Sequence, residues 1–149
     1  MKSAIIVLVL GIVLTCVSST RSDPEGFAVW PGVVSHIAET EVPWEELGDY
    51  HNHLIATSFI RDDGPAEVHE SQIEIWIVHD GNATLVVGGE ILEPKTVKPH
   101  EIRGLSIKGG SETPLTQGAI VHIPANLPHQ LKIAHGKYLI YTTIRMDAR

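Results

Sequence analysis

EVHESQIEIWIVHDG, residues 67–81, is the stretch that decides the fold of this chain. Its second half is rich in β-branched and aromatic residues, which predicts a strand from Ile73 to Val78. The same pattern resumes at 84–87 after Asp80-Gly81, so a hairpin is predicted with its turn at that dipeptide. Glu67 and His69 are two residues apart, and on a strand both side chains would point to one face.

Glu74 follows His69 after four intervening residues, on the predicted strand. Two polar side chains from one strand and a carboxylate from the next can converge on one point inside a sheet. Imidazole and carboxylate groups are ligands that divalent metal ions accept in proteins. The stretch therefore predicts part of a metal site, and a further ligand has to come from elsewhere in the chain.

The rest of the chain favours an all-β fold. Past the first 20 residues, no segment shows a 3.6-residue apolar period over ten or more residues. Surface loops are predicted at 93–100 and 109–111, and one helical turn at 43–47, where Pro43 is followed by acidic residues. Further strands are predicted at 33–37, 52–61, 90–92, 102–107, 119–123, 130–133 and 138–144. Many short strands with frequent turns indicate an antiparallel sandwich or barrel.

The N-terminus has the plan of a secretory signal peptide. Lys2 precedes an uncharged apolar run from Ala4 to Leu14, and small residues follow, with cleavage expected after Ser18 or Ser19. The run is too short to span a bilayer, which takes about 20 apolar residues. A lipid anchor on Cys16 and an uncleaved anchor are the alternatives. We expect a signal peptide over 1–19, an N-terminal lead-in with an edge strand over 20–49, and a barrel over 50–145.

Composition limits the partners. Of 149 residues, about 130 remain after cleavage, enough for one domain with its own core. The formal net charge of −7 argues against binding to nucleic acid or to anionic membranes. Cys16 is the single cysteine, so no disulfide framework is expected in a secreted domain. Asn82-Ala83-Thr84 matches a glycosylation sequon, which matters only in a eukaryotic source.

A second stretch, GAIVHIPANLPHQL at 118–131, completes a family resemblance. Glu67-x-His69-x4-Glu74-x6-Gly81 and Gly118-x5-Pro124-x-Asn126-x2-His129-x3-Ile133 follow each other in the order of the two motifs of the cupin superfamily. The chain thus resembles a small cupin over roughly residues 50 to 145, and this implies a single cupin-type antiparallel β-barrel, a double-stranded jelly roll.

The chain departs from the family pattern at four positions. Arg61 stands where the first motif opens with Gly, and Glu67 replaces its first His. In the second motif Asn126 replaces Gly and Ile133 replaces the final Asn. Asn tolerates a positive φ better than most residues, so a turn at Asn126 stays feasible.

The resemblance implies a divalent metal inside the barrel, with His69, Glu74 and His129 as ligands. Such a set suits Fe, Mn, Zn, Ni or Co and does not select among them. Glu67 is expected either to be a fourth ligand or to lie beside the metal ligands, as a base that shuttles protons or as a group that orients His69 or a bound water. A barrel without metal is the competing interpretation, but burying these groups together with no ion would leave charge unpaired at a high cost.

Further residues are predicted to line the pocket. Trp76 shares strand parity with Glu74 and faces inward, as pocket wall or as core. His53, His122, Gln130 and Tyr141 are the weaker pocket residues, whereas His79 is expected to be exposed.

Two functions follow as expectations. The first is a secreted metal-dependent enzyme acting on a small molecule, of the oxygenase, isomerase or lyase type. The alternative is a non-catalytic module that binds a sugar or an organic acid, and a structural or storage protein is a third interpretation. The resemblance also implies a homodimer as a reasonable expectation.

Overall fold

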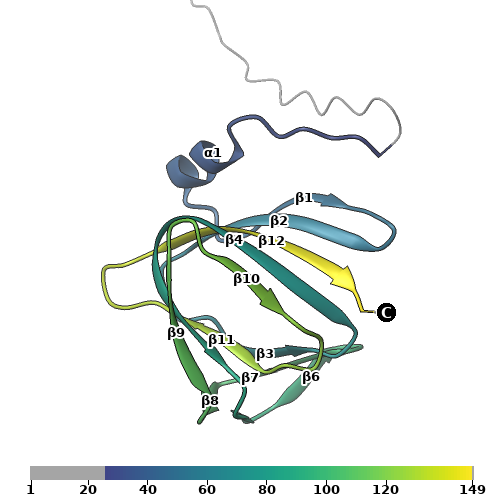
Figure 1. The fold of residues 1–149 in the computed structure, drawn as a ribbon, viewed down its shortest axis with the longest axis vertical. Coiled ribbons are helices and arrows are strands. Elements are labelled where there is room, and N and C mark those ends of the chain that lie inside the picture. Colours follow the sequence, from purple (N-terminus) through teal and green to yellow (C-terminus); the bar gives the residue numbers. More distant parts are fainter. Residues whose placement is uncertain (1–25, 149) are drawn as a thin grey trace, which may run out of the picture.

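The computed structural model describes residues 26–148, which form one helix and twelve strands (Figure 1). The expected signal peptide, with Cys16, lies outside the described residues. No helix among residues 26–148 is long and apolar enough to cross a membrane. The elements are α1 (Val33–Thr40), β1 (Glu45–Asp49), β2 (His53–Ile60), β3 (Ala66–His69), β4 (Gln72–Val87), β5 (Glu90–Leu92), β6 (Lys95–Lys98), β7 (Glu101–Gly104), β8 (Ser106–Lys108), β9 (Ser111–Thr116), β10 (Ile120–Ile123), β11 (His129–Lys132) and β12 (Leu139–Asp147).

The strands form a curled antiparallel sheet, which confirms the predicted all-β barrel (Figure 1). Its hydrogen-bonded order is β1-β2-β12-β4-β11-β3-β7-β6, and β9 and β10 also pair with β4. A separate two-stranded sheet is formed by β5 and β8. Strand β4 belongs to both halves of the barrel, because its first part pairs with β10 and β12 and its second part with β9 and β11.

The predicted hairpin at Asp80-Gly81 is wrong, because β4 runs through this dipeptide as one 16-residue strand. Gly81 has φ +86, and a Cβ at this position would collide with the carbonyl of Tyr138. The Asp80 carboxylate accepts a hydrogen bond from the Gly81 N–H at 2.8 Å and one from the Tyr138 hydroxyl at 2.8 Å. Pairing with β12 shifts register here, so the glycine bends the strand from one half of the barrel into the other.

The interior has an apolar part and a polar part. Alternate residues of β4 point inward, and Trp76 and Val78 pack with Leu85, Leu131 and Leu139 in the main core. Glu74, two residues before Trp76, lies on the same face and is also buried. The inward-facing polar side chains therefore start where the apolar core ends.

The segment 33–37, predicted as an edge strand, is the first part of helix α1. Ile37 is fully buried and packs with Phe59 and Ile140 on the outer face of the barrel, with Val33 and Val34 beside it. β-Branched residues favour strands only weakly, so burial of one helical face against the sheet outweighs that preference.

The segment 43–47, predicted as a helical turn, leads into strand β1 instead. Glu45 and Glu46 pair with Thr57 and Ala56 of β2, and a bulge follows before Gly48. An isolated helical turn is unstable in water, and the edge of β2 offers a ladder of backbone hydrogen bonds to this segment.

Four further strands were missed or merged in the sequence-based prediction. The expected loop 93–100 contains β6, an edge strand whose four residues are all exposed. The single strand expected at 102–107 is divided into β7 and β8, and the loop at 109–111 leads directly into β9. Prolines and charges are common on exposed edge strands, so composition alone did not separate an edge strand from a loop. The strands expected at 52–61, 90–92, 119–123, 130–133 and 138–144 are confirmed as β2, β5, β10, β11 and β12.

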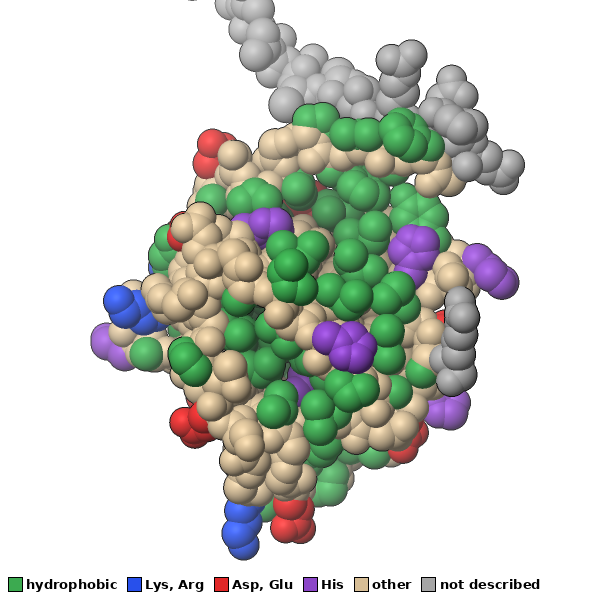
Figure 2. Space-filling model, viewed as in Figure 1, with side chains coloured by type: hydrophobic (Ala, Val, Ile, Leu, Met, Phe, Trp, Pro, Cys, Tyr) green, Lys and Arg blue, Asp and Glu red, His purple; other side chains and the backbone are tan. Residues whose placement is uncertain are grey.

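Figure 2 shows that hydrophobic side chains make up much of one outer face of the barrel. Exposed hydrophobic residues of the chain include Phe27 and Val29, before α1, and Ile120 at the start of β10, which is 74% exposed.

Candidate metal centre

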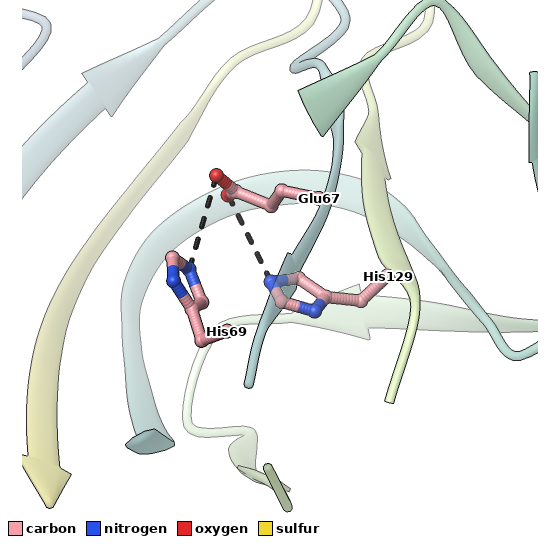
Figure 3. Close-up of side chains that lie close together, drawn as sticks. All are labelled: Glu67, His69 and His129. Carbon is pink, nitrogen blue, oxygen red and sulfur yellow. Dashed lines mark ion pairs between the residues drawn. The ribbon is translucent and has the colours of Figure 1, made fainter. Parts of the chain in front are cut away.

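The side chains predicted as metal ligands come from three strands. Glu67 and His69 both belong to β3 and point into the barrel, as their two-residue spacing predicts. His129 begins β11 and pairs directly with Glu67. Glu74 belongs to the first half of β4. Figure 3 shows the side chains of Glu67, His69 and His129 pointing toward one another.

The four side chains surround a common space. Ligand atoms of Glu67, His69 and His129 lie within 4.8 Å of one another. The Glu67 carboxylate oxygens are 3.9 Å from His69 Nε2 and 3.8 Å from His129 Nε2. Glu74 Oε1 is 3.5 Å from His69 Nε2, and its Oε2 is 3.2 Å from His129 Nε2. The structure therefore brings all four predicted residues together.

Three of the converging atoms are buried and make no hydrogen bond of good geometry among the described residues, although two of them, His129 Nε2 and Glu74 Oε2, form an ion pair at 3.2 Å when His129 is protonated. The three atoms are His69 Nε2, His129 Nε2 and Glu74 Oε2. A buried polar atom left unpaired costs about 1–3 kcal/mol, and more if it is charged. Three such atoms facing one space would all be satisfied by a single divalent cation, so the residues fit a metal ion.

Each imidazole ring has an oxygen atom beside its Nδ1, at hydrogen-bond distance for His129 and farther away for His69. His129 Nδ1 lies 3.0 Å from the carbonyl oxygen of Leu127, which accepts its proton. His69 Nδ1 lies 3.6 Å from Glu101 Oε2. A hydrogen on Nδ1 leaves the lone pair on Nε2, the atom that faces the common space, as in most histidine metal sites.

Glu101 was missed in the sequence analysis. It is buried on β7, where it pairs directly with His69 of β3, and it contacts Lys98 Nζ at 2.9 Å and Arg103 Nε at 2.8 Å. The alternation of side chains along a strand would have indicated that Glu101 faces the same side as His69 only if β7 had been predicted to pair with β3.

Arg145 was also missed. It lies opposite Glu74 in the pairing of β12 with β4, and its Nε and Nη2 donate to Glu74 Oε1 at 2.8 and 2.6 Å. The guanidinium also lies over the ring of Trp44, 5.9 Å from its centroid. One oxygen of Glu74 is thus held by an arginine while the other faces His129.

Burial separates the protonation behaviour of the two histidines. It lowers the pKa of His69 to about 4, although Glu74 acts in the opposite direction. Burial would also lower the pKa of His129, but the carboxylates of Glu74 and Glu67 raise it above its ordinary value. His69 is therefore neutral at neutral pH, in the form that binds metal, whereas His129 holds its proton more firmly.

The two carboxylates differ as well. Burial alone would raise the pKa of Glu74, but His129 and Arg145 lower it to about 2. Burial raises the pKa of Glu67, and the negative charge of Glu74 adds to this effect. Glu67 is also the more accessible of the two, with 19% of its side chain exposed against 2% for Glu74. It is the carboxylate better suited to exchange a proton with solvent.

The predicted pocket residues divide into inner and outer positions. Trp76 lies inside, with its ring centroid 5.8 Å from that of His129 and 5.0 Å from that of Tyr141. Burial, together with the charges of Glu74 and Glu67, raises the pKa of Tyr141. His53 lies outside the cluster, stacked on Tyr50 at the barrel rim.

Two pocket predictions are corrected by strand parity. His122 pairs with Ile75 and is exposed on the outer face, because its neighbour Ile123 pairs with the inward-facing Glu74. Gln130 is buried, but it alternates with His129 and binds the Gly64 carbonyl and the Ile107 N–H at 2.9 and 3.2 Å. Its side chain connects β11 with the turn at Gly64 and with strand β8.

The expected exposure of His79 is also corrected. The residue is half-buried, and its Nε2 lies 2.7 Å from the Thr142 hydroxyl.

No family model and no curated protein matches the sequence, but solved structures share its fold. A protein of Bacillus halodurans has a TM-score of 0.61 and 14% identity, covering 87% of this chain and 87% of its own. A cupin 2 conserved barrel domain protein from Salinispora arenicola has a TM-score of 0.50 and 17% identity, covering 70% and 75%. An RmlC-like cupin family protein with a double-stranded β-helix fold from Methanocaldococcus jannaschii has a TM-score of 0.50 and 14% identity, covering 70% and 78%.

At these identities the likeness concerns the fold. The chain has the cupin fold, a double-stranded β-helix, as the two motifs implied. Within this fold, Glu67, His69 and His129 form a group that could hold a metal ion.

Proposed function

We propose that the barrel binds one divalent transition-metal ion through His69, His129 and Glu74, and that the protein is a metal-dependent enzyme acting on a small molecule. The observation that carries the metal site is the convergence of three buried atoms that make no hydrogen bond of good geometry, His69 Nε2, His129 Nε2 and Glu74 Oε2. A metal held there would supply a Lewis acid that polarises a carbonyl or enediolate oxygen. The reaction would be of the oxygenase, isomerase or lyase type.

Glu67 is proposed to complete the site, as a fourth ligand or as the residue that moves a proton. Its raised pKa and its partial exposure support the second role. A carboxyl group that titrates closer to neutral pH is a better general acid or base than Glu74, whose pKa lies near 2. The variant Glu67→Gln distinguishes the two roles. If Glu67 only moves a proton, the metal content of the variant stays unchanged; if Glu67 is a ligand, the metal content falls.

Metal content of the purified protein tests the proposal. We expect close to one iron, manganese, zinc, nickel or cobalt per chain, and loss of that metal in His69→Ala and His129→Ala. His122→Ala is the matched control, since His122 is exposed on the outer face. Equal metal content in all four proteins would refute the site.

A second candidate is a non-catalytic module that binds a sugar or an organic acid. The bidentate contact of Arg145 with Glu74 favours it, because this pair already neutralises one carboxylate without a metal. Turnover of any compound in a substrate screen with added metal would decide against this candidate.

The location and the oligomeric state are proposed from the sequence. A signal peptide over residues 1–19 supports secretion to the periplasm or the cell exterior. N-terminal sequencing of the exported protein tests this, and an intact Met1 would contradict it. The proposed homodimer is tested by light scattering, where the mass of a single chain, below the 16.3 kDa of the uncleaved 149 residues, would indicate a monomer.

A further inference from the structure

The strands that carry Glu74 and its partners present aliphatic side chains on their outer side. Glu74, Trp76 and Val78 are buried and point into the barrel, so Ile75 and Ile77 between them point outward. Strands β2, β12, β4 and β10 lie side by side (Figure 1), and residues directly opposite in neighbouring strands share a face. The outward apolar residues form one isoleucine face, made of Ile55, Ile73, Ile75, Ile77, Ile120, Ile144 and Met146.

The isoleucine face belongs to neither core cluster of the described residues. Its side chains are partly exposed, and that of Ile120 is 74% exposed. The outward positions of β2, β10, β12 and the first half of β4 hold no Asp, Glu, Lys or Arg. An antiparallel sheet with one side in water normally alternates apolar-in and polar-out, whereas apolar side chains on both sides are typical of a sheet that is covered on both. We therefore expect a partner on this face.

Helix α1 covers only one end of the sheet. Ile37 packs on Phe59 and Ile140, which are paired across β2 and β12. The helix has eight residues, about 12 Å of length. Ile55 and Ile144 form the pair four residues further along the same strands, about 13 Å away. The isoleucine face thus continues the surface on which the helix packs, beyond the end that the helix covers.

The segment that precedes the described residues is not suited to cover this face. Between the expected cleavage site after Ser19 and Gly26 lie residues 20–25, TRSDPE. They hold three charges and no large apolar side chain. Burial of aliphatic surface is favourable only against other apolar groups, so this segment would gain little by packing on isoleucines.

The chemistry of the face fits a second copy of the chain. Nucleic acids and anionic membranes are held by Lys and Arg, which the face lacks. Two twisted sheets pack face to face about 10 Å apart, and a twofold axis brings one patch against the same patch of the other copy. Four strands about 4.8 Å apart and about six residues long give a flat area of about 400 Å². That area supplies the apolar centre of an interface whose standard size is about 800 Å² per partner.

We propose that the isoleucine face is the interface between two copies of this chain, related by a twofold axis. The inference rests on the proposed homodimer and names the surface that forms it. Ile144 lies at its centre, between Ile55 and Ile75, and Ile120 lies at its edge on β10. The metal ligands point to the other side of the same sheet, so each copy keeps its own site.

Light scattering of the exported protein over a range of concentrations tests the inference. We expect the mass of two chains for the unmodified protein. Ile144→Lys should raise the dissociation constant of the dimer by about 100-fold or more, because the twofold axis buries the lysines of both copies. Ile120→Lys should raise it by about tenfold, because a lysine at the edge keeps its charge in water.

Leu105→Lys is the matched control. Leu105 is 69% exposed and lies between β7 and β8, outside the isoleucine face, so this variant should remain a dimer. All three variants should keep the far-ultraviolet circular dichroism and the metal content of the unmodified protein, which separates a lost interface from a lost fold. If Ile144→Lys fails to fold, Ile120→Lys decides alone, since its side chain is already 74% exposed.

Three outcomes would overturn the inference, and they are distinguishable. A monomeric unmodified protein would refute the homodimer together with its interface. A dimer that survives both Ile144→Lys and Ile120→Lys would leave the homodimer standing and place its interface elsewhere. A monomer that binds vesicles of neutral phosphatidylcholine, and loses this binding in the same two variants, would assign the face to lipid.

Discussion

Glu74→Gln should destabilise the metal-free protein by an amount that depends on pH. Glu74 is buried, and its pKa is lowered from 4.5 to about 2. A carboxyl group whose pKa is lower in the folded state than in the unfolded state stabilises the fold. This contribution is complete at pH values above the pKa of the unfolded state, and it is lost as the pH falls to the pKa of the folded state. The shift of roughly 2.5 units corresponds to about 3 kcal/mol at pH 7, falling to about 2 kcal/mol near pH 3.5.

The glutamine keeps the shape of the side chain and cannot ionise, so it lacks this pH-dependent term. It also leaves the Arg145 guanidinium without its charged partner, which increases the loss at neutral pH. The free energy of unfolding should be measured in urea, with a chelator present, at several pH values from 7 to 3.5. Glu112→Gln, a change of an exposed residue on β9, is the control and should leave the unfolding free energy nearly unchanged at every pH.

The reasoning predicts that the difference between Glu74→Gln and the unmodified protein narrows as pH falls. A difference that is small at pH 7, or equally large at pH 7 and pH 3.5, would refute the assignment of Glu74 as a buried, ionised partner of Arg145.

Three other predictions follow from the site and its scaffold. Glu101→Gln should lower metal affinity by about 10–100-fold, because it removes the carboxylate beside His69 Nδ1. Competition with a chromophoric chelator measures the metal affinity, and an unchanged affinity would contradict the prediction. Gly81→Ala should lower the free energy of unfolding by more than Gly118→Ala. Both glycines have a φ near +85, but only at Gly81 would a Cβ meet a backbone carbonyl. Urea unfolding of the two variants measures the difference, and equal losses of unfolding free energy would contradict the prediction. Metal affinity should fall as pH is lowered, because the pKa of His129 is raised and its proton must leave before Nε2 can bind the metal. Calorimetric titration of the metal in two buffers measures the protons released on binding. Metal binding without proton release near the pKa of His129 would contradict the prediction.

Local patterns were sufficient to predict the inward face of β3. The two-residue spacing of Glu67 and His69 determines a shared face on any strand, whatever its neighbours are. The motif that contains His129 supplied the rest through resemblance, and the structure brings that residue next to Glu67.

The partners of the ligands could not be predicted in this way. Arg145 and Glu74 are 71 residues apart in sequence and meet only through the register of β12 on β4. Glu101 required the pairing of β7 with β3. Register between distant strands depends on the packing of the whole barrel, which one strand's pattern does not contain.

Two of the wrong predictions share one cause, which is that a local signal had two physical solutions. Asp80-Gly81 is typical of a tight turn, but a glycine with positive φ also permits a bend within a continuous strand. Val33 and Val34 are typical of strands, but spaced with Ile37 they also form one face of a short helix. Contacts with the rest of the barrel selected the second solution in both cases.

The continuity of β4 has a consequence for how the folded barrel unfolds transiently and exposes its backbone amides to solvent. This strand hydrogen-bonds to β10 and β12 before Gly81 and to β9 and β11 after it, so both halves of the barrel share one backbone. Neither half can detach and leave β4 fully paired. Amide hydrogen exchange in β4, β11 and β12 should therefore occur through a single cooperative opening. The same event would separate Glu74 from His129, so a bound ion could slow exchange at backbone amides on both sides of the barrel.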